Sequence, residues 1–484
     1  MQCVGAAFCV VCQNGANETL SELRRFLALL YTKFLAKSPK PQTIVPIAAM
    51  ISNEESIVPS GVMPVSNHAY LYLRYVSLNG YHESKSLRLK SVGSIEAIQF
   101  LNYVGVLMTP DGTQIEILPK VAKHADSDSL IDDSRQALLN MLKSLGEFRH
   151  LQTNNADLLQ QKMPLLEVFI GQFLSAVNRL IKKGIKRDYQ SQNDNLLFLK
   201  GKLDPSQQLK HNLVQKQRFA VAYDEYLPDT LMNQLIKAAI KKVLNITRSI
   251  KHQKLARELE FVFADVSQLN LKALNKLDIN IERSTEHYTA PVAWSKLILT
   301  GMSPLSMQGN ANAFSLLFPL EAVFESYVEQ ILRRTFPDNL QVKGQSKKHH
   351  LVTYQQRKMF NLKPDITVLY GEFSLLILDT KWKLIDTNKN NGTDKFMLSQ
   401  QDFYQMYAYG HKYLNGVGNL VLIFPVNERF SFPLPSPFAF SAELRLWVVP
   451  FDIHRATPDD KRLRIPAELA ELLMPKAKHL LDVE

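Results

Sequence analysis

Apolar residues recur every three or four positions in several segments of the chain, a spacing that places them on one face of an α-helix. The first such segment is Ser21–Lys37, and the proline-containing residues 38–41 end its pattern. We therefore predict an N-terminal helical appendage over residues 1–41. The apolar positions of this helix are Leu23, Phe26, Leu27, Leu30, Phe34 and Leu35.

The same spacing dominates the middle of the chain and predicts a helical domain over residues 129–304. Leu165–Lys183 has one continuous apolar face, and Gly184 follows where a helix C-cap is expected. Thr230–Leu244 repeats the pattern after Asp229, a candidate N-cap. Because stripes of this kind usually serve core packing, we assign them no chemistry.

Residues 42–128 have the composition of a β-rich domain. Tyr70–Val76 contains mostly strand-forming residues. Tyr103–Met108 and Gln114–Val121 flank Thr109–Thr113, whose Pro-Asp-Gly sequence is a strong turn signal. We predict a β-hairpin from these two runs.

Residues 305–484 mix both patterns, which is typical of an α/β domain. A helical segment at Phe318–Arg334 precedes several strand-like runs and a second helical segment at Gln401–Leu414. Further strands are predicted at Asn419–Phe424 and Leu444–Phe451. The fold class expected for the whole chain is therefore multidomain α+β: a β-rich N-terminal region, a central helical region and a C-terminal α/β domain.

Composition and charge limit the functional classes. The 484 residues are 46% hydrophobic and 21% charged, so each domain can bury a core. The formal net charge of +11 favours a polyanionic partner, although a solvated basic surface remains the alternative. Basic residues are spread along the chain, with denser groups at Lys182–Lys186 and Lys343–Lys348.

Cysteine content and hydropathy exclude two further classes. Cys3, Cys9 and Cys12 are the only cysteines, and an odd cluster at one end cannot form a disulfide framework for this length. The sequence has no apolar run of the roughly 18–20 residues needed to span a bilayer. We expect a cytoplasmic protein with no membrane partner.

One predicted hairpin carries a pattern typical of metal-dependent catalysis. Its strands are Ile366–Tyr370 and Phe373–Leu378, around Gly371 and Glu372. With a loop at residues 371–373, the residues directly before and after the two strands face each other. These residues are Asp365 and Asp379.

Asp365 and Asp379 would be close enough to share one hard cation such as Mg²⁺. Lys381 lies two positions after Asp379 and therefore points to the same side of the strand. Thr380 would point away, but its carbonyl oxygen could be a further metal ligand. The arrangement is that of the PD-(D/E)xK nucleases, and its alternative is a surface ion pair at a strand end.

Two flanking helices offer additional site residues. Glu325 lies off the apolar face of the helix that precedes the hairpin, and Glu321, one turn earlier, is its rival as the helix carboxylate. Gln405 and Tyr409 are one turn apart on the following helix, which resembles the Q-x-x-x-Y helix of some nucleases of this class. The candidate catalytic set is thus Asp365, Asp379, Lys381, Glu325 and Gln405, and the candidate metal ligands are Asp365, Asp379, Glu325 and Thr380.

The chain resembles the McrC family, the nuclease subunits of McrBC restriction systems, over about residues 95–455. The segments that carry the resemblance outside the hairpin are Asn102–Val106, Ile115–Lys120, Lys186–Tyr189, Leu199–Leu203, Tyr223–Tyr226, Asp229, Thr230, Asn233 and Phe318–Val328. The last of these segments makes Glu325 the better match for the acidic position. The chain departs from the family at Lys200 and Lys202, where Arg is common, because Lys cannot make the same bidentate contacts.

The resemblance implies a division of labour between two proteins. The partner would be a hexameric McrB-like AAA+ GTPase that recognises 5-methylcytosine and translocates double-stranded DNA. The chain would dock through its N-terminal portion, residues 42–128, stimulate GTP hydrolysis and cut DNA with a Mg²⁺-dependent PD-(D/E)xK endonuclease domain at residues 305–484. The sequence has no G-x-x-x-x-G-K-[ST] phosphate loop, so we do not expect it to hydrolyse GTP itself.

Two alternatives stay open at this point. One is a stand-alone nuclease of the RecB-like kind, suggested by Gln405 and Tyr409. The other is a non-catalytic adaptor that activates the GTPase ring. The presence of Asp365, Asp379 and Lys381 together argues against the adaptor.

Overall fold

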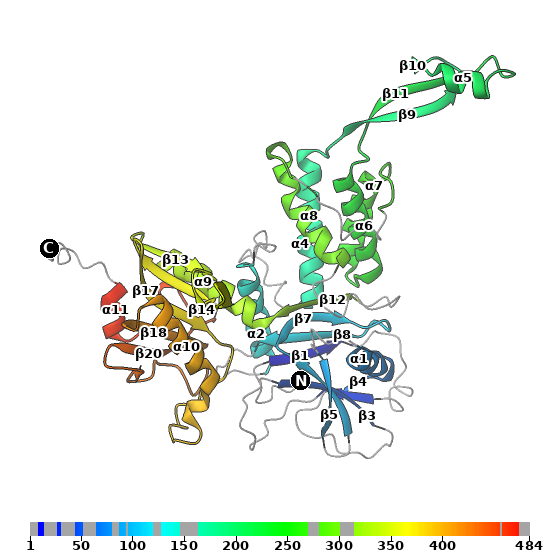
Figure 1. The fold of residues 1–484 in the computed structure, drawn as a ribbon. Helices are drawn as coiled ribbons and strands as arrows, with labels where there is room; N and C mark the ends of the chain where they lie inside the picture. Colours follow the sequence, from blue (N-terminus) through cyan, green and yellow to red (C-terminus); the bar gives the residue numbers. More distant parts are fainter. Residues whose placement is uncertain are drawn as a thin grey trace. The chain divides into compact units, whose positions relative to one another are not determined.

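The computed structural model describes residues 8–13, 27–30, 44–51, 64–79, 87–92, 95–119, 127–145, 163–269, 279, 281–300, 314–454 and 457–473. These residues belong to two compact units (Figure 1). One unit is formed by Met163–Gly301, and the other by the segments before and after it. None of the described helices is both long and apolar enough to cross a membrane.

The N-terminal part of the first unit contains two sheets. The four-stranded sheet has the order β1-β8-β7-β12, and the five-stranded sheet has the order β4-β2-β3-β6-β5. Their strands are β1 (Phe8–Gln13), β2 (Leu27–Leu30), β3 (Ile44–Ile51), β4 (Pro64–Ser66), β5 (Leu87–Val92), β6 (Ile95–Leu101), β7 (Tyr103–Met108), β8 (Gln114–Pro119) and β12 (Phe314–Pro319). The predicted hairpin is confirmed by β7 and β8, which pair antiparallel. Its turn is closed by the Gly112 N–H, which donates to the Thr109 carbonyl at 2.9 Å.

Two predictions for this region are wrong. Within the predicted helix Ser21–Lys37, the described residues 27–30 form strand β2, paired with β3 and β4. Tyr70–Val76, predicted as a strand, lies in helix α1 (Asn67–Asn79), where Tyr70, Leu73 and Val76 are buried at helical spacing. Tertiary pairing and periodicity outweigh residue propensity in both cases.

Strand β12 connects the two halves of the first unit. It follows the inserted second unit in sequence and pairs antiparallel with β7, which precedes that unit. Gly105 on β7 makes the close approach possible, because a Cβ there would lie 2.0 Å from the Leu316 carbonyl oxygen. The predicted boundary at residue 305 therefore places β12 in the C-terminal domain, although its hydrogen bonds join it to the N-terminal sheet.

The second unit is built mainly from helices, as the hydrophobic pattern predicts. They are α4 (Leu165–Lys183), α6 (Leu231–Ile246), α7 (Ile250–Val262) and α8 (Thr289–Thr300). Helix α4 has the predicted bounds, with Gly184 as its C-cap. The N-cap of α6 is Thr230, whose side chain accepts from the Asn233 N–H, rather than the predicted Asp229. The Asp229 carboxylate instead accepts from Ser267 and Gln234.

The helical prediction missed a three-stranded sheet in the second unit, ordered β10-β11-β9. Its elements are β9 (Asp188–Leu196), β10 (Lys202–Leu203), α5 (Pro205–His211) and β11 (Phe219–Leu227), seen beyond the helices in Figure 1. The middle segments that resemble the McrC family meet on this sheet. The rings of Tyr189 and Tyr226 lie 5.0 Å apart, and the Lys200 ammonium lies 3.7 Å from the centre of the Tyr223 ring.

A six-stranded mixed sheet forms the core of the C-terminal part, in the order β13-β16-β17-β18-β20-β19. Strands β17, β18 and β20 run parallel to one another, and the remaining pairs are antiparallel. The strands are β13 (Leu340–Gly344), β16 (Ile366–Tyr370), β17 (Phe373–Thr380), β18 (Gly418–Pro425), β19 (Phe438–Ala439) and β20 (Leu444–Phe451).

Helices cover both faces of this sheet. The apolar side chains of α10 (Gln400–Tyr413) pack against Ile377, Leu422 and Leu446 on one face. Phe324 of α9 (Leu320–Thr335) packs edge-on against Phe451, which is an odd number of positions from Leu446 and so faces the other side. The β16–β17 hairpin is therefore held between two helices. Other helices of this unit are α2 (Ser127–Leu142) and α11 (Ala467–Leu473), and a separate two-stranded ribbon is formed by β14 (His350–Tyr354) and β15 (Arg357–Asn361).

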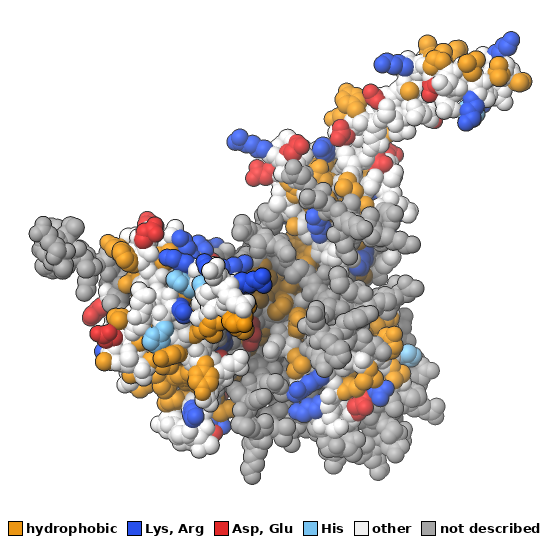
Figure 2. Space-filling model, in the orientation of Figure 1, with side chains coloured by type: hydrophobic (Ala, Val, Ile, Leu, Met, Phe, Trp, Pro, Cys, Tyr) orange, Lys and Arg blue, Asp and Glu red, His pale blue; other side chains and the backbone are white. Residues whose placement is uncertain are grey.

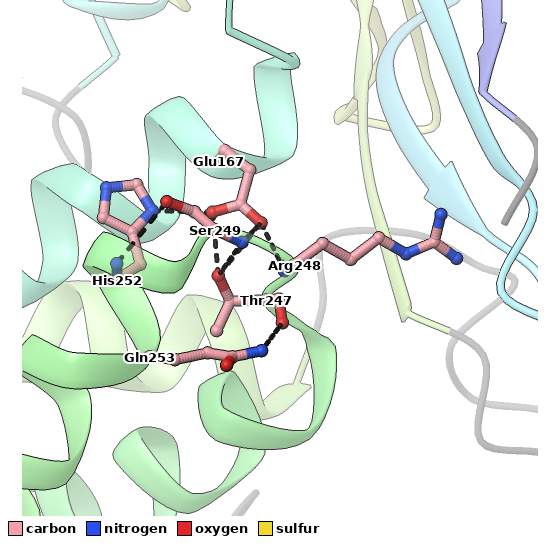
Figure 3. Close-up of polar contacts among 6 residues, drawn as sticks. All are labelled: Glu167, Thr247, Arg248, Ser249, His252 and Gln253. Atoms are coloured by element: carbon pink, nitrogen blue, oxygen red, sulfur yellow. Dashed lines mark hydrogen bonds and ion pairs between the residues drawn. The ribbon is translucent and has the colours of Figure 1, made fainter. Parts of the chain in front are cut away.

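A buried carboxylate joins the helices of the second unit (Figure 3). Glu167 on α4 accepts hydrogen bonds from the Thr247 hydroxyl at 2.9 Å and the Arg248 N–H at 2.7 Å. The His252 Nδ1 lies 2.6 Å from the same carboxylate and must carry the proton, since an ionised carboxylate only accepts. Burial acts to raise the pKa of Glu167, but these hydrogen bonds outweigh it and leave the pKa below its usual range.

We expect Glu167→Ala to destabilise the second unit by about 3 kcal/mol, because it leaves buried donors on Thr247, Arg248 and His252 without their acceptor. Thermal unfolding of the full chain, with hydrogen exchange measured at residues 247–253, checks this. Glu258→Ala, at an exposed position of α7, is the matched control and should change little. Equal exchange rates in the two variants would contradict a structural role for the Glu167 carboxylate.

Candidate catalytic centre

The β16–β17 hairpin has the register that the sequence predicts, although it achieves it differently. Its loop contains two residues, since Tyr370 pairs with Phe373, and a bulge between Val368 and Leu369 then shifts the ladder by one position. The shorter loop and the bulge compensate each other, so Ile366 pairs with Leu378. The positions of Asp365 and Asp379 therefore follow at the same end of the hairpin.

The Asp365 side chain turns toward Thr380. Its Oδ2 accepts from the Thr380 N–H at 2.7 Å and from the Thr380 hydroxyl at 2.8 Å. The expectation that the Thr380 side chain points away is therefore wrong. Asp365 lies one residue before β16 begins, so strand alternation does not fix the direction of its side chain.

Asp379 is fully buried at the end of β17, with 0% of its surface exposed. The Lys381 ammonium lies 2.5 Å from its Oδ2, and the Gln405 amide donates to its Oδ1 at 3.4 Å. Burial and the neighbouring charge of Asp365 raise the pKa of Asp379 to about 7, and Lys381 offsets only part of this shift. The carboxylate thus lies in surroundings that need additional positive charge when it is ionised.

Lys381 is held beside both aspartates by its position on the sheet. Its N–H donates to the Ile423 carbonyl of β18 at 2.9 Å, which continues the parallel pairing one residue past β17. Burial acts to lower the pKa of Lys381, but attraction to Asp379 and Asp365 outweighs it and raises the pKa above the usual range. The side chain therefore stays cationic, as the prediction from the Asp-x-Lys spacing requires.

Helix α9 supplies Glu325 rather than Glu321 to this neighbourhood. Glu321 is exposed in the first turn of α9, where a carboxylate stabilises the helix N-terminus. Glu325 is partly buried and accepts from the Gln345 amide at 3.1 Å. Burial and the charge of Asp365 raise the pKa of Glu325 to about 7, so Glu325 lies within electrostatic reach of Asp365.

Helix α10 places Gln405 and Tyr409 against the hairpin, one turn apart. The Gln405 amide donates to the Tyr409 hydroxyl at 2.8 Å as well as reaching Asp379. The Tyr409 hydroxyl donates in turn to the Lys363 carbonyl at 2.9 Å, just before Asp365. Gln405 is therefore oriented by a hydrogen-bonded chain that runs from α10 to the segment leading into β16.

The sequence reasoning missed one charged pair. The Lys383 ammonium lies 2.6 Å from the Asp402 Oδ2 on α10, and Asp402 is buried. The charge of Asp402 also raises the pKa of Asp379 and of Lys381. Two signals pointed to this pair: Asp402 lies one turn before Gln405, and Lys383 continues the two-residue alternation after Lys381.

The carboxylates do not form a preassembled cage. Among the described residues, no three His, Cys, Asp or Glu side chains are grouped closely enough to hold a metal ion. Asp365 and Asp379 are each turned toward a protein donor, as the contacts above show. Two carboxylates nevertheless match the ligand supply that Mg²⁺ takes from proteins, since its remaining positions are filled by water and substrate phosphate.

Comparison with known proteins identifies the family of the chain. The family model described as McrBC 5-methylcytosine restriction system component matches residues 98–425, more than half of the chain. The chain belongs to this family. No curated protein sequence matches closely enough to count as a relative.

Two solved structures show a similar chain. One is described as a refined half-complex from a tetradecameric assembly of Thermococcus gammatolerans McrB AAA+ hexamers with bound McrC. The match is 21% identical, covers 78% of this chain and 84% of that one, and has a TM-score of 0.57, which establishes a shared fold. A cryo-EM structure of the Thermococcus gammatolerans McrBC complex is also 21% identical, over 55% of this chain and 79% of that one, with a TM-score of 0.40.

The raised pKa of Asp379 predicts a pH-dependent stability in the absence of divalent ions. A folded-state pKa near 7 against an unfolded value of 3.8 means that Asp379 stabilises the fold at low pH. This contribution is lost as the pH rises toward 7. Asp379→Asn stays neutral at every pH. We therefore expect its melting temperature to rise relative to that of the parent chain as the pH is raised from 5 to 8 in EDTA. A constant difference across this range would show that Asp379 is ionised throughout.

Proposed function

We propose that the chain is the nuclease subunit of an McrBC-like restriction complex, a Mg²⁺-dependent endonuclease with a PD-(D/E)xK centre. The observation that carries this proposal is the pairing of a fully buried Asp379 with Lys381 at the end of a central strand, next to Asp365. A surface ion pair would be exposed, and Asp379 is not. Family membership supports the same assignment.

The donor set fits a hard cation. The Asp379 Oδ2 is buried and accepts no well-aligned hydrogen bond, with only the Lys381 ammonium beside it. Burial raises the pKa of Asp365, Asp379 and Glu325, and the charge of Asp365 raises the pKa of the other two further. A bound cation would offset both effects. We infer that Asp365 and Asp379 hold Mg²⁺, with the Thr380 carbonyl as a further ligand, and that Glu325 joins them by a side-chain movement when the ion binds. When bound, the ion would polarise the scissile phosphate and acidify a water molecule.

The remaining residues have roles that follow from their positions. Lys381 orients the attacking water and offsets the negative charge that builds on the phosphate. To do so, the Lys381 ammonium gives up part of its contact with Asp379 and contacts the substrate instead. Gln405 fixes the direction of the Asp379 carboxylate, since its amide is itself held by Tyr409.

We infer that the partner is a hexameric AAA+ GTPase of the McrB kind, acting on double-stranded DNA. The similar Thermococcus gammatolerans structure contains McrB AAA+ hexamers with bound McrC. The sequence of this chain lacks a phosphate-binding loop of the G-x-x-x-x-G-K-[ST] type, so GTP hydrolysis falls to the partner. The chain would dock through its N-terminal region, stimulate that hydrolysis and cut the DNA.

Asp379→Ala should lower Mg²⁺-dependent DNA cleavage by at least about 100-fold, because it removes a carboxylate that holds the ion. Cleavage of plasmid DNA by the full chain with its partner, measured at equal protein concentration, checks this. Binding to the partner should be unchanged. Retained cleavage would reject Asp379 as a catalytic residue.

Glu325→Gln and Glu321→Gln form a matched pair for this experiment, since both lie on α9 and lose the same charge. Only Glu325→Gln should reduce cleavage. Equal cleavage by both variants would remove α9 from the centre while leaving the Asp379 result intact.

A nicking assay with and without the GTPase partner separates the proposed function from its alternatives. We expect Mg²⁺-dependent cleavage only when the AAA+ partner and GTP are present. Cleavage by the isolated chain would favour a stand-alone nuclease. Stimulated GTP hydrolysis with no cleavage under any condition would favour a non-catalytic adaptor.

A further inference from the structure

A basic stretch lies next to the candidate catalytic centre, and none of its charged side chains takes part in the contacts of that centre described above. Between Asp338 and Asp365 the sequence contains no acidic residue and six basic ones. None of these six side chains forms a salt bridge with an acidic residue in the described part of the chain. Figure 2 shows Lys, Arg and His side chains grouped over the region where Figure 1 labels β13 and β14. The six are Lys343, Lys347, Lys348, Arg357, Lys358 and Lys363.

Most of this stretch forms the two-stranded ribbon β14–β15, which we define as residues 346–362. All residues from 351 to 361 are exposed, so the two strands cover no core. The exposed fractions of Tyr354 and Phe360 are 61% and 71%. A two-stranded ribbon is at most marginally stable by itself, so its exposure on both faces indicates a surface that contacts another molecule.

Helix α10 fixes the base of the ribbon. The Tyr413 hydroxyl lies 2.9 Å from the Ser346 carbonyl oxygen and 3.0 Å from that of Leu362, one at each end of the ribbon. The His349 ring also packs edge-on against Tyr413, with 4.5 Å between the ring centres. Because α10 also carries Gln405, which reaches Asp379, one helix positions both the ribbon and the catalytic carboxylate.

The tip of the ribbon holds two polar side chains in an unusual backbone conformation. Gln355 and Gln356 have φ values of 45° and 62°, as a two-residue hairpin turn requires, in positions that favour Asn and Gly. Both are exposed. At the other end, burial and the charges of Lys348, His350 and Lys412 lower the pKa of His349, which reflects the positive potential around the ribbon base.

We propose that residues 346–362 are a DNA-binding ribbon that holds double-stranded DNA over the catalytic centre. Lys347, Lys348, Arg357 and Lys358 contact phosphate groups, and the two-stranded ribbon has the size that a DNA major groove admits. The unpaired positive charge of these four side chains favours DNA over an uncharged protein surface as the partner. DNA phosphates would neutralise the four cations, whereas an uncharged surface would leave them without counterions. This inference rests on the proposed nuclease function, because the ribbon would supply the DNA substrate to the nuclease site.

The test is the salt dependence of DNA binding by the full chain in EDTA, measured by fluorescence anisotropy with a labelled 30-base-pair duplex. Lys347→Gln/Lys348→Gln removes two phosphate contacts. The slope of log K against log salt concentration should become shallower by about 1.8, at about 0.9 for each contact. Arg357→Gln/Lys358→Gln should have a similar effect.

Two matched variants serve as controls. Lys395→Gln/Lys461→Gln removes two exposed lysines outside the ribbon and should leave the slope unchanged. Lys347→Arg/Lys348→Arg keeps the charge and should retain the parental slope. Melting temperatures of all variants show whether each one folds. An unchanged slope in both ribbon variants, or an equal change in the lysine controls, would overturn the proposal.

Cleavage assays separate this proposal from the nuclease function. If the ribbon variants bind DNA normally while Asp379→Ala abolishes cleavage, the ribbon proposal fails and the nuclease function stands. If the slope changes as expected but the parent chain and its partner cut no DNA, the nuclease function fails. Variants that bind DNA normally but no longer stimulate GTP hydrolysis would assign the ribbon to a protein partner and overturn the proposal.

Discussion

The burial of one carboxylate, Asp379, constrains the whole candidate catalytic centre. A charged group with no exposed surface is stable only beside compensating charge and hydrogen-bond donors, and these come from the end of its own strand and from a distant helix. Lys381 follows it on the same strand, while Gln405 reaches it from α10. The same helix also carries Asp402, which pairs with Lys383. The mixed sheet and its two covering helices thus hold together charged side chains that would otherwise repel one another or be surrounded by water.

The connection between the two halves of the first unit depends on close backbone packing rather than charge. Strand β12 follows the inserted unit and returns to pair with β7, and helix α9 begins directly after it. The Leu320 N–H donates to the Asn102 carbonyl at 2.8 Å, which fixes the start of α9 against the N-terminal sheet. Because α9 carries Glu325, the N-terminal sheet helps to set the position of a candidate site residue.

Charge is divided between two neighbouring surfaces of the C-terminal part. In the candidate catalytic centre the charge of Asp365 raises the pKa of Asp379 and of Glu325, whereas the β14–β15 ribbon has basic residues and no acidic one. A polyanion would be attracted by the ribbon and repelled by the carboxylates unless a cation lies between them. This division of charge supports the proposals that a divalent ion and the basic ribbon act together on a phosphate near Asp379.

The sequence by itself determined the features that depend on neighbours along the chain. The β16–β17 hairpin, the shared side of Asp379 and Lys381, and the spacing of Gln405 and Tyr409 follow from strand and helix periods. Only the tertiary structure decided what depends on distant partners. It turned Asp365 toward Thr380, brought Asp402 of α10 to Lys383, and formed strand β2 and helix α1 against local propensity. The physical reason is that periodicity is local, whereas burial and pairing are set by residues far apart in sequence.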